Sequence, residues 1–122
     1  MAIEYKNSLK NVTSTGSDQV VYTCPTSTSL LKYMAIVKGF VIYNTTGGAG
    51  TVDIKVVDTS AGVTARIVKH FTATDFTTKA TVNAVSEGPI VLESADVLKI
   101  DTSVAANVLI TVMEISDELR GV

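Results

Sequence analysis

Alternation of apolar and polar residues is the feature that most restricts how this chain can fold. In the segment TVDIKVVD, residues 51–58, the side chains of Val52, Ile54 and Val56 fall on one side of an extended strand. Val and Ile together supply 27 of the 122 residues, and Ser and Thr supply another 27. Because β-branched residues lose rotamer freedom in helices and fit the pleated surface of a sheet, the chain is expected to be all-β.

Segments of this kind recur along the chain, with turn signals roughly every 8–12 residues. The predicted strands cover residues 12–15, 19–24, 33–45, 51–58, 63–72, 72–86, 89–92, 97–102 and 107–115. A series of about eight strands suits a two-sheet jelly roll. The predicted fold is one all-β domain over residues 1–122, an antiparallel two-sheet β-sandwich, jelly-roll-like, with polar terminal arms.

The segment YMAIVKGFVIYNT, residues 33–45, is the longest strand signal. Strict alternation places Ala35, Val37, Val41 and Tyr43 on one face, and Ile36, Phe40 and Ile42 on the other with Lys38. Both faces are largely apolar, which indicates a central strand. Gly39 in its middle predicts a bend or a bulge.

The two ends of the chain are polar. Residues 1–18 are predicted to form an N-terminal arm with a short edge strand, and residues 117–122 a flexible tail. Ile3, Tyr5 and Leu9 stand as isolated apolar residues in the first ten. We therefore expect this arm to lie on a partner through these three side chains.

The glycine-rich stretch GGAG raises the question of a phosphate-binding loop. A P-loop needs Gly-Lys-Ser/Thr after its glycines, and a dinucleotide-binding loop opens a helix. Here Gly47, Gly48 and Gly50 are followed by Thr51 and then by a strand. The stretch is predicted to be a hairpin turn, in which glycine supplies positive φ angles.

Neither the one histidine nor the one cysteine has the surroundings of a catalytic residue. His70 lacks a local nucleophile elbow of the GxSxG type and is interpreted as a polar residue on a strand surface. Cys24 follows a strand and precedes Pro25, and it is interpreted as a small buried residue. One cysteine and one histidine cannot build a zinc site, and no cofactor is expected.

Two pairs of carboxylates were considered for glycosidase or calcium chemistry. Asp53 with Asp58, and Asp96 with Asp101, lie on predicted strands and their turns, where Lys55 or Lys99 separates them. Solvated strand faces of mixed charge explain this pattern better. The chain is therefore predicted to have no catalytic or metal site and not to be an enzyme.

Charge and hydropathy argue against several classes of partner. The net charge is −2, and no window concentrates Lys or Arg, so binding to nucleic acid is not expected. No run of 18 apolar residues is present, so no membrane span is expected. The polar start, MAIEYKNSLK, lacks the apolar region of a signal peptide, which predicts a protein made in the cytoplasm.

From residue 19 to residue 116 the order of motifs resembles small virion structural proteins of tailed bacteriophages. The matching stretches are VVYTCPTSTS, AIVKGFVIYNTTGGAGTVDIKVVDTS, EGPIVLESADVLKIDTS and ANVLITVMEIS. Members of that group show a VYTVP strand, a PLVLEAGD segment and a closing VSVLEIS strand. Two departures are Cys24 in place of an apolar residue and Ser94-Ala95-Asp96 in place of an Ala-Gly-Asp turn.

This resemblance implies a particle component that decorates the capsid surface, where trimers bind the major capsid protein at capsomer junctions and stabilise the shell. The expected partners are therefore the major capsid protein and further copies of the chain in a homotrimer. A neck or tail subunit is one alternative. A receptor-binding or carbohydrate-binding module of a tail fibre is another, for which Tyr33 and Tyr43 are the candidate aromatic residues.

Overall fold

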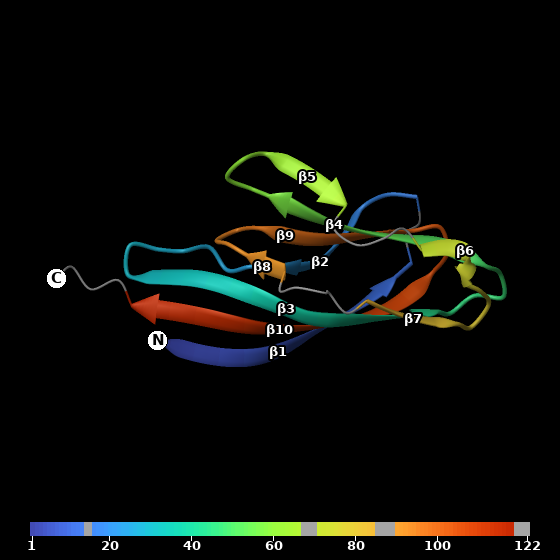
Figure 1. Cartoon of the computed structure of the whole chain (residues 1–122), viewed down its shortest axis with the longest axis horizontal. Coiled ribbons are helices and arrows are strands. Elements are labelled where there is room, and N and C mark those ends of the chain that lie inside the picture. The colour runs from blue at the N-terminus through green and yellow to red at the C-terminus, as the bar shows by residue number, and fades with distance from the viewer. Residues whose placement is uncertain (14–15, 67–70, 85–89, 119–122) are drawn as a thin grey trace.

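The computed structural model describes residues 1–13, 16–66, 71–84 and 90–118, and its regular structure is all strand (Figure 1). Its strands are β1 (Ala2–Val12), β2 (Gln19–Thr23), β3 (Leu31–Asn44), β4 (Gly50–Asp58), β5 (Val63–Arg66), β6 (Phe71–Phe76), β7 (Thr81–Ala84), β8 (Ile90–Leu92), β9 (Val97–Thr102) and β10 (Ala106–Glu118). The predicted strand 63–72 is thus divided between β5 and the start of β6. The predicted strand 72–86 holds the rest of β6 and β7, with a turn between them.

The strands form two antiparallel sheets packed face to face (Figure 1). One sheet has the order β1-β10-β3, and both β7 and β8 pair with β3 along different parts of its length. The other has the order β2-β9-β4, and both β5 and β6 pair with β4. The short strands β7 and β8 share one place beside β3, and β5 and β6 share one place beside β4. Counted in this way each sheet has four strand places, and their order is that of a jelly roll built from two Greek keys. The predicted all-β fold of two packed antiparallel sheets is confirmed.

The core lies between the two sheets and consists of the inward residues of each strand. Val52 and Ile54 of β4 are at most 2% exposed, as their alternation predicted. The other fully buried side chains come from both sheets and are mainly aliphatic, among them Val12, Ile42, Phe76, Leu92, Leu98, Ile100, Val108, Ile110 and Val112. Burial of these side chains is the main stabilising contribution to a domain of this size.

Strand β3 is central, as predicted, but strict alternation assigned its faces wrongly. Ala35, Val37, Phe40 and Ile42 are all buried, whereas Val41 is 42% exposed. The register against β10 shifts here, because Val112 pairs with Val37 while Thr111 pairs with Gly39. Lys38 is therefore the extra residue of a β-bulge, which reverses the phase of alternation beyond it. The predicted bulge is confirmed, and it is the reason why the faces differ.

The N-terminal segment is an integral strand of its sheet and not a separate arm with a short edge strand, whereas contact with a partner through Ile3, Tyr5 and Leu9 stays a prediction. All eleven residues of β1 pair with β10 without a register shift, from Ala2 opposite Ser116 to Val12 opposite Ala106. On the outward side, Ile3, Tyr5 and Leu9 lie opposite the apolar Ile115, Met113 and Leu109, and such cross-strand pairs stabilise a sheet. At the other end, β10 continues through Asp117 and Glu118 of the predicted tail.

The GGAG stretch does turn the chain, but not as a hairpin. It joins β3 to β4, which belong to different sheets, so it is a crossing between sheets. The glycines with positive φ among the described residues are Gly16 and Gly62, so the predicted positive φ in GGAG was wrong. Gly50 is required for another reason, because a Cβ there would overlap the side chain of Val104 and lie 2.9 Å from Ser103 Oγ.

Asn44, the last residue of β3, holds this crossing in place. Its side chain is fully buried. The Nδ2 group donates to the carbonyl oxygens of Gly48 at 2.8 Å and Thr77 at 3.0 Å, and Oδ1 accepts from the backbone N–H of Thr46 at 2.8 Å. One amide thereby connects the end of β3, the crossing itself and the turn after β6.

The turn before β9 keeps a left-handed residue at the position where the resembling family has glycine. Ala95 has a φ of 66°. The turn is closed by Asp96, whose Oδ2 accepts from the N–H of Glu93 at 2.9 Å and whose Oδ1 accepts from the N–H of Thr59 at 3.1 Å. These bonds hold Ala95 in a conformation that is unfavourable for a residue with a Cβ.

Replacing Ala95 with glycine is therefore expected to raise the free energy of unfolding by about 0.5–1 kcal/mol, because relief of the left-handed strain exceeds the added flexibility of the unfolded chain. Urea unfolding would measure the change. Ala61→Gly in the neighbouring exposed turn is the control, because Ala61 does not have a positive φ and glycine there should only destabilise. Equal effects of the two substitutions would contradict this account.

Candidate protein-binding face

The outer side of the β1–β10–β3 sheet is apolar over most of its length. Directly paired residues of antiparallel strands point to the same side, so the outward residues of the strands can be read from the register. We define the apolar face by these residues: Ile3, Tyr5, Leu9, Met34, Ile36, Val41, Tyr43, Val91, Leu109, Met113 and Ile115. The predicted site residues Ile3, Tyr5 and Leu9 thus lie together on one surface, at the β1 side of this face.

Several side chains of the apolar face are largely exposed. Leu9 is 79% exposed, Tyr5 68% and Ile3 51%, and Val91 is also about half exposed. Outward polar positions within the face carry uncharged residues such as Asn7 and Thr111, which are joined by a hydrogen bond of 3.0 Å. Contiguous apolar patches of several hundred Å² are typical of interaction sites.

Few charged residues lie on this face, and all but Lys38 lie at one end of it. Within the described part of β1, β3 and β10, the outward charged residues are Lys32 and Asp117 at one end, and Lys38 lies at the bulge. The N-terminal amino group is 3.5 Å from Asp117 Oδ1 at the same end. A partner that binds this face would therefore contact mainly apolar side chains.

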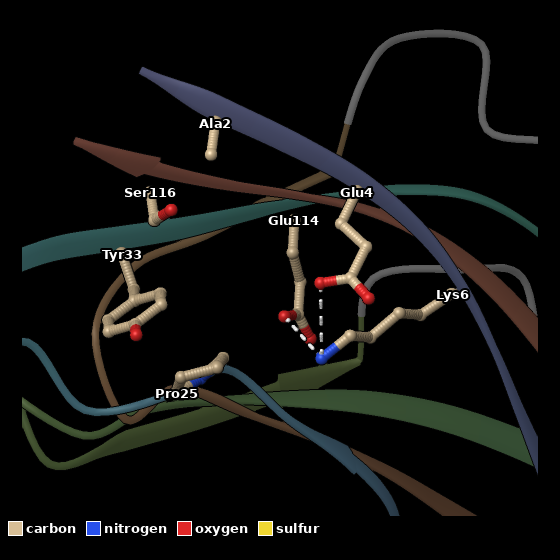
Figure 2. A pocket seen from close by; sticks show the side chains of 7 residues that line it. All are labelled: Ala2, Glu4, Lys6, Pro25, Tyr33, Glu114 and Ser116. Atoms are coloured by element: carbon tan, nitrogen blue, oxygen red, sulfur yellow. Dashed lines mark ion pairs between the residues drawn. The ribbon is translucent and has the colours of Figure 1, made fainter.

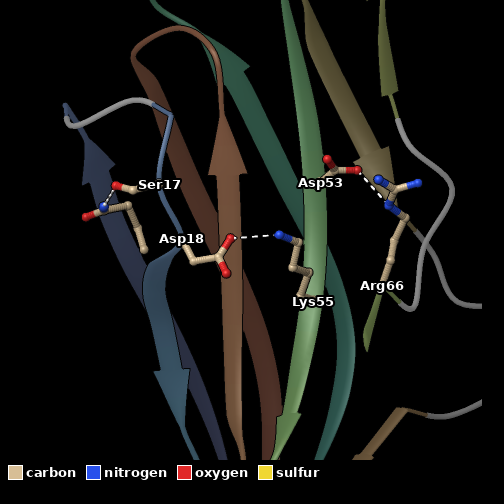
Figure 3. Close-up of polar contacts among 6 residues, drawn as sticks. Ser17, Asp18, Asp53, Lys55 and Arg66 are labelled. Atoms are coloured by element: carbon tan, nitrogen blue, oxygen red, sulfur yellow. Dashed lines mark hydrogen bonds and ion pairs between the residues drawn. The ribbon is translucent and has the colours of Figure 1, made fainter. Parts of the chain in front are cut away.

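The outer side of the other sheet is different, because it carries paired charges (Figure 3). Lys55 Nζ lies 2.9 Å from Asp18 Oδ1, and Arg66 Nε lies 2.8 Å from Asp53 Oδ1. The hydrogen bond from Lys55 to Asp18 raises the pKa of the lysine. Mixed charge of this kind is typical of a solvated surface, so the two outer sides of the sandwich differ in the environment for which they are suited.

The carboxylates considered for chemistry are not brought together in the predicted pairs. Asp58 accepts from the hydroxyl of Ser60, which lowers its pKa, and Asp96 is buried in the turn before β9. Asp53 instead lies opposite Asp101 across β4 and β9. Among the described residues, no group of three or more His, Cys, Asp or Glu side chains could hold a metal ion.

Cys24 is fully buried, as predicted. Its Sγ lies 3.7 Å from the carbonyl oxygen of Leu92, and its N–H donates to the carbonyl of Asp96 at 2.9 Å. Burial, with the nearby carboxylates of Glu114 and Asp96, raises the pKa of the thiol to about 11. The thiol is therefore protonated and a weak nucleophile at neutral pH. His70 lies outside the described residues.

A small hollow opens beside β1, on the inner side of the β1–β10–β3 sheet (Figure 2). It has a volume of about 210 Å³ and is lined by Ala2, Glu4, Lys6, Pro25, Tyr33, Glu114 and Ser116. Tyr33 points into this hollow, whereas Tyr43 belongs to the apolar face on the opposite side of the sheet. The two tyrosines considered for carbohydrate binding therefore do not form one aromatic platform.

Glu114 is the side chain in this hollow that sequence reasoning missed. It is 8% exposed, and Lys6 Nζ lies 3.0 Å from its Oε1. The hydroxyl of Tyr22 donates to its Oε2 at 2.5 Å. Burial and the bond to Glu114 raise the pKa of Tyr22, and the bond to Glu114 raises that of Lys6. Both carboxylate oxygens have donors, so Glu114 joins β1, β2 and β10 rather than presenting a reactive group.

The signal for Glu114 was present in the sequence. It follows Val108, Ile110 and Val112 at the inward positions of β10, where a charged residue needs a partner. The apolar face had a signal as well, because the outward Leu109 and Met113 make β10 apolar on both sides. A strand that is apolar on both sides is either covered on both sides or presents one of them to a partner.

Comparisons with known proteins assign no family to this chain. No family model and no curated protein matches this chain. Among solved structures, the chain is similar to a subunit of Bacillus endospore appendages, described as a novel family of disulfide-linked pili. The identity is 13% and the TM-score 0.45, and the match covers 97% of this chain and 89% of that chain. In the described part of the chain, no helix is long and apolar enough to cross a membrane.

Proposed function

We propose that this chain is a structural protein of a bacteriophage virion, which decorates the capsid surface and binds the major capsid protein through its apolar face. The observation that carries this proposal is the exposed, largely apolar face that contains Ile3, Tyr5 and Leu9. The resemblance of residues 19–116 to virion structural proteins supplies the identity of the partner. The proposed role is mechanical and requires no catalysis.

Binding through this face would use the sandwich as a rigid block. A sheet face paired along all of β1, β10 and β3 changes shape little on binding, so little conformational entropy is lost. Burial of the exposed side chains of Leu9, Tyr5 and Ile3 would provide most of the affinity. The charged outer side of the other sheet would remain in water.

The copy number of the chain in purified virions tests whether it belongs to the particle and where. Quantitative mass spectrometry against the major capsid protein is expected to give a ratio near one copy per capsid subunit. A ratio of a few per cent would replace the decoration role by one in the neck, tail or fibres. Absence of the chain from the particles would overturn the proposal.

Substitution of Leu9 by aspartate tests the face itself. Leu9→Asp is expected to weaken binding to virions that lack the protein by roughly 100-fold, because it places a charge in an apolar interface. Stability should fall by no more than about 1 kcal/mol, since Leu9 is 79% exposed and loses only its cross-strand contact with Leu109. Co-sedimentation with such virions would measure the binding.

Leu30→Asp is the matched control, because Leu30 is 71% exposed and lies outside the apolar face. It makes the same chemical change and should leave binding unaltered. Equal loss of binding in the two variants, or in neither, would contradict an interaction through this face.

A further inference from the structure

Strand β1 has a long edge that is regular and open. It is the outermost strand of its sheet, and no other described strand pairs with its far side (Figure 1). Its eleven residues contain neither proline nor a bulge, and the pairing with β10 shows no shift. Natural edges are usually kept short or interrupted, because unpaired N–H and C=O groups are a template for another strand.

The order of charges along β1 suits a second copy of the same strand. In an antiparallel pair about a two-fold axis at Asn7, each residue lies opposite the one equally far on the other side of Asn7. On the inner side, Glu4 then lies opposite Lys10 of the second copy, and this contact occurs twice. On the outer side, Tyr5 lies opposite Leu9 of the second copy. All eleven residues take part.

Other symmetric registers pair like charges or use less of the strand. An axis at Lys6 places this lysine opposite itself, and an axis at Ser8 places Lys6 opposite Lys10. An axis at Tyr5 sets Glu4 opposite Lys6 but leaves the end of the strand unpaired, and Lys6 is already bound to Glu114. The charges therefore favour one register out of several and do not simply block the edge.

We propose that the chain forms a homodimer in which β1 pairs with β1 of a second copy, antiparallel about a two-fold axis at Asn7. The two β1–β10–β3 sheets become one continuous sheet. Because paired residues point to the same side, the two apolar faces join into a single surface of twice the size. This inference goes beyond the proposed function and predicts a dimer, whereas the family resemblance implies a trimer.

The first test is a cross-link in the purified full chain. In Asn7→Cys the two introduced thiols face each other across the axis, at a spacing that permits a disulfide, so rapid oxidation to a covalent dimer is expected. In Asn11→Cys, the control on the same side of the same strand, the two thiols are separated by eight residue positions along the pair, roughly 27 Å. It should not cross-link. Cys24 is buried in both proteins.

The second test reverses the charge. Lys10→Glu places glutamate opposite Glu4 twice and is expected to raise the dimer Kd by roughly tenfold, as measured by light scattering on dilution. The double variant Glu4→Lys with Lys10→Glu should regain most of the affinity. Lys38→Glu, at the exposed bulge of β3, makes the same change in net charge and should have no effect.

These outcomes separate this proposal from the proposed function, because no particle is present. A dimer that cross-links at Asn7→Cys alone and responds to charge reversal supports edge pairing, whatever the copy number in virions. The proposal is overturned by a trimer, or by a chain that stays monomeric and does not cross-link at Asn7→Cys. It is also overturned by equal cross-linking of the two cysteine variants, or by a dimer that is insensitive to Lys10→Glu.

Discussion

Replacing Asn44 with alanine is expected to lower the free energy of unfolding by about 3 kcal/mol, because buried groups lose their partners at several points at once. The carbonyl oxygen of Thr77 would lose its side-chain donor and the N–H of Thr46 its acceptor, whereas the carbonyl oxygen of Gly48 would lose one of two donors and keep the hydroxyl of Thr46. Alanine also leaves a small cavity where the amide is fully buried. Urea unfolding followed by circular dichroism would measure the loss.

Two further variants show whether the amide itself is responsible. Asn44→Asp keeps an oxygen that accepts from the N–H of Thr46, but it turns a carboxylate oxygen toward carbonyl oxygens, which repel it. This variant should therefore be no more stable than Asn44→Ala. Thr46→Ala removes only the partly exposed hydroxyl of the same turn and should cost less than about 1 kcal/mol. An Asn44→Ala protein as stable as Thr46→Ala would show that the amide does not hold the crossing between sheets.

Substitution of Tyr22 by phenylalanine is expected to cost about 2 kcal/mol, because it removes one of the two donors to the buried carboxylate of Glu114. The matched control is Tyr33→Phe, which removes a hydroxyl in the same hollow. It should be close to neutral. Chemical unfolding at pH 7 would measure both proteins, and equal costs would contradict a specific role for the bond to Glu114.

The same variant is expected to change the response to alkali. The pKa of Tyr22 is raised in the folded state above its ordinary value of 10.0, first by burial and then by the bond to Glu114. The folded protein therefore holds this proton longer than the unfolded chain, and its contribution is intact below pH 10 and lost as the pH rises further. Tyr22→Phe should show a shallower loss of stability above pH 10 than the wild-type protein. An unchanged slope would contradict this account.

Local alternation was sufficient where a stretch of strand pairs without a register shift, as β4 does with β9 from Val52 to Val57. In β4, the inward positions of Val52 and Ile54 follow directly from the sequence. In β3 the same reasoning failed beyond Lys38, because one extra residue reverses the phase and Gly39 only marks its neighbourhood. A bulge is a property of two strands, and β10, which fixes its position, is remote in the sequence.

The candidate site was predicted in part for a similar reason. Ile3, Tyr5 and Leu9 were predicted to bind a partner because they are isolated apolar residues in a polar segment, and their common parity places them on one side of β1. Their position on a paired strand could not be recognised, since the partner β10 lies at the other end of the chain. Glu114 needed Tyr22 and Lys6 from two other strands before its burial could be explained.

The pairing of the first strand with the last has a consequence for how the protein is made. Asn7 and Thr111, joined by a hydrogen bond, are 104 residues apart, so β1 cannot pair with β10 until the ribosome has reached β10. Contacts this distant in sequence make folding slow, and they leave Ile3, Tyr5 and Leu9 without their sheet during that time. A chain released before β10 has been synthesised would therefore lack the strand that pairs with β1. A truncation that removes either β1 or β10 would abolish the same strand pairing.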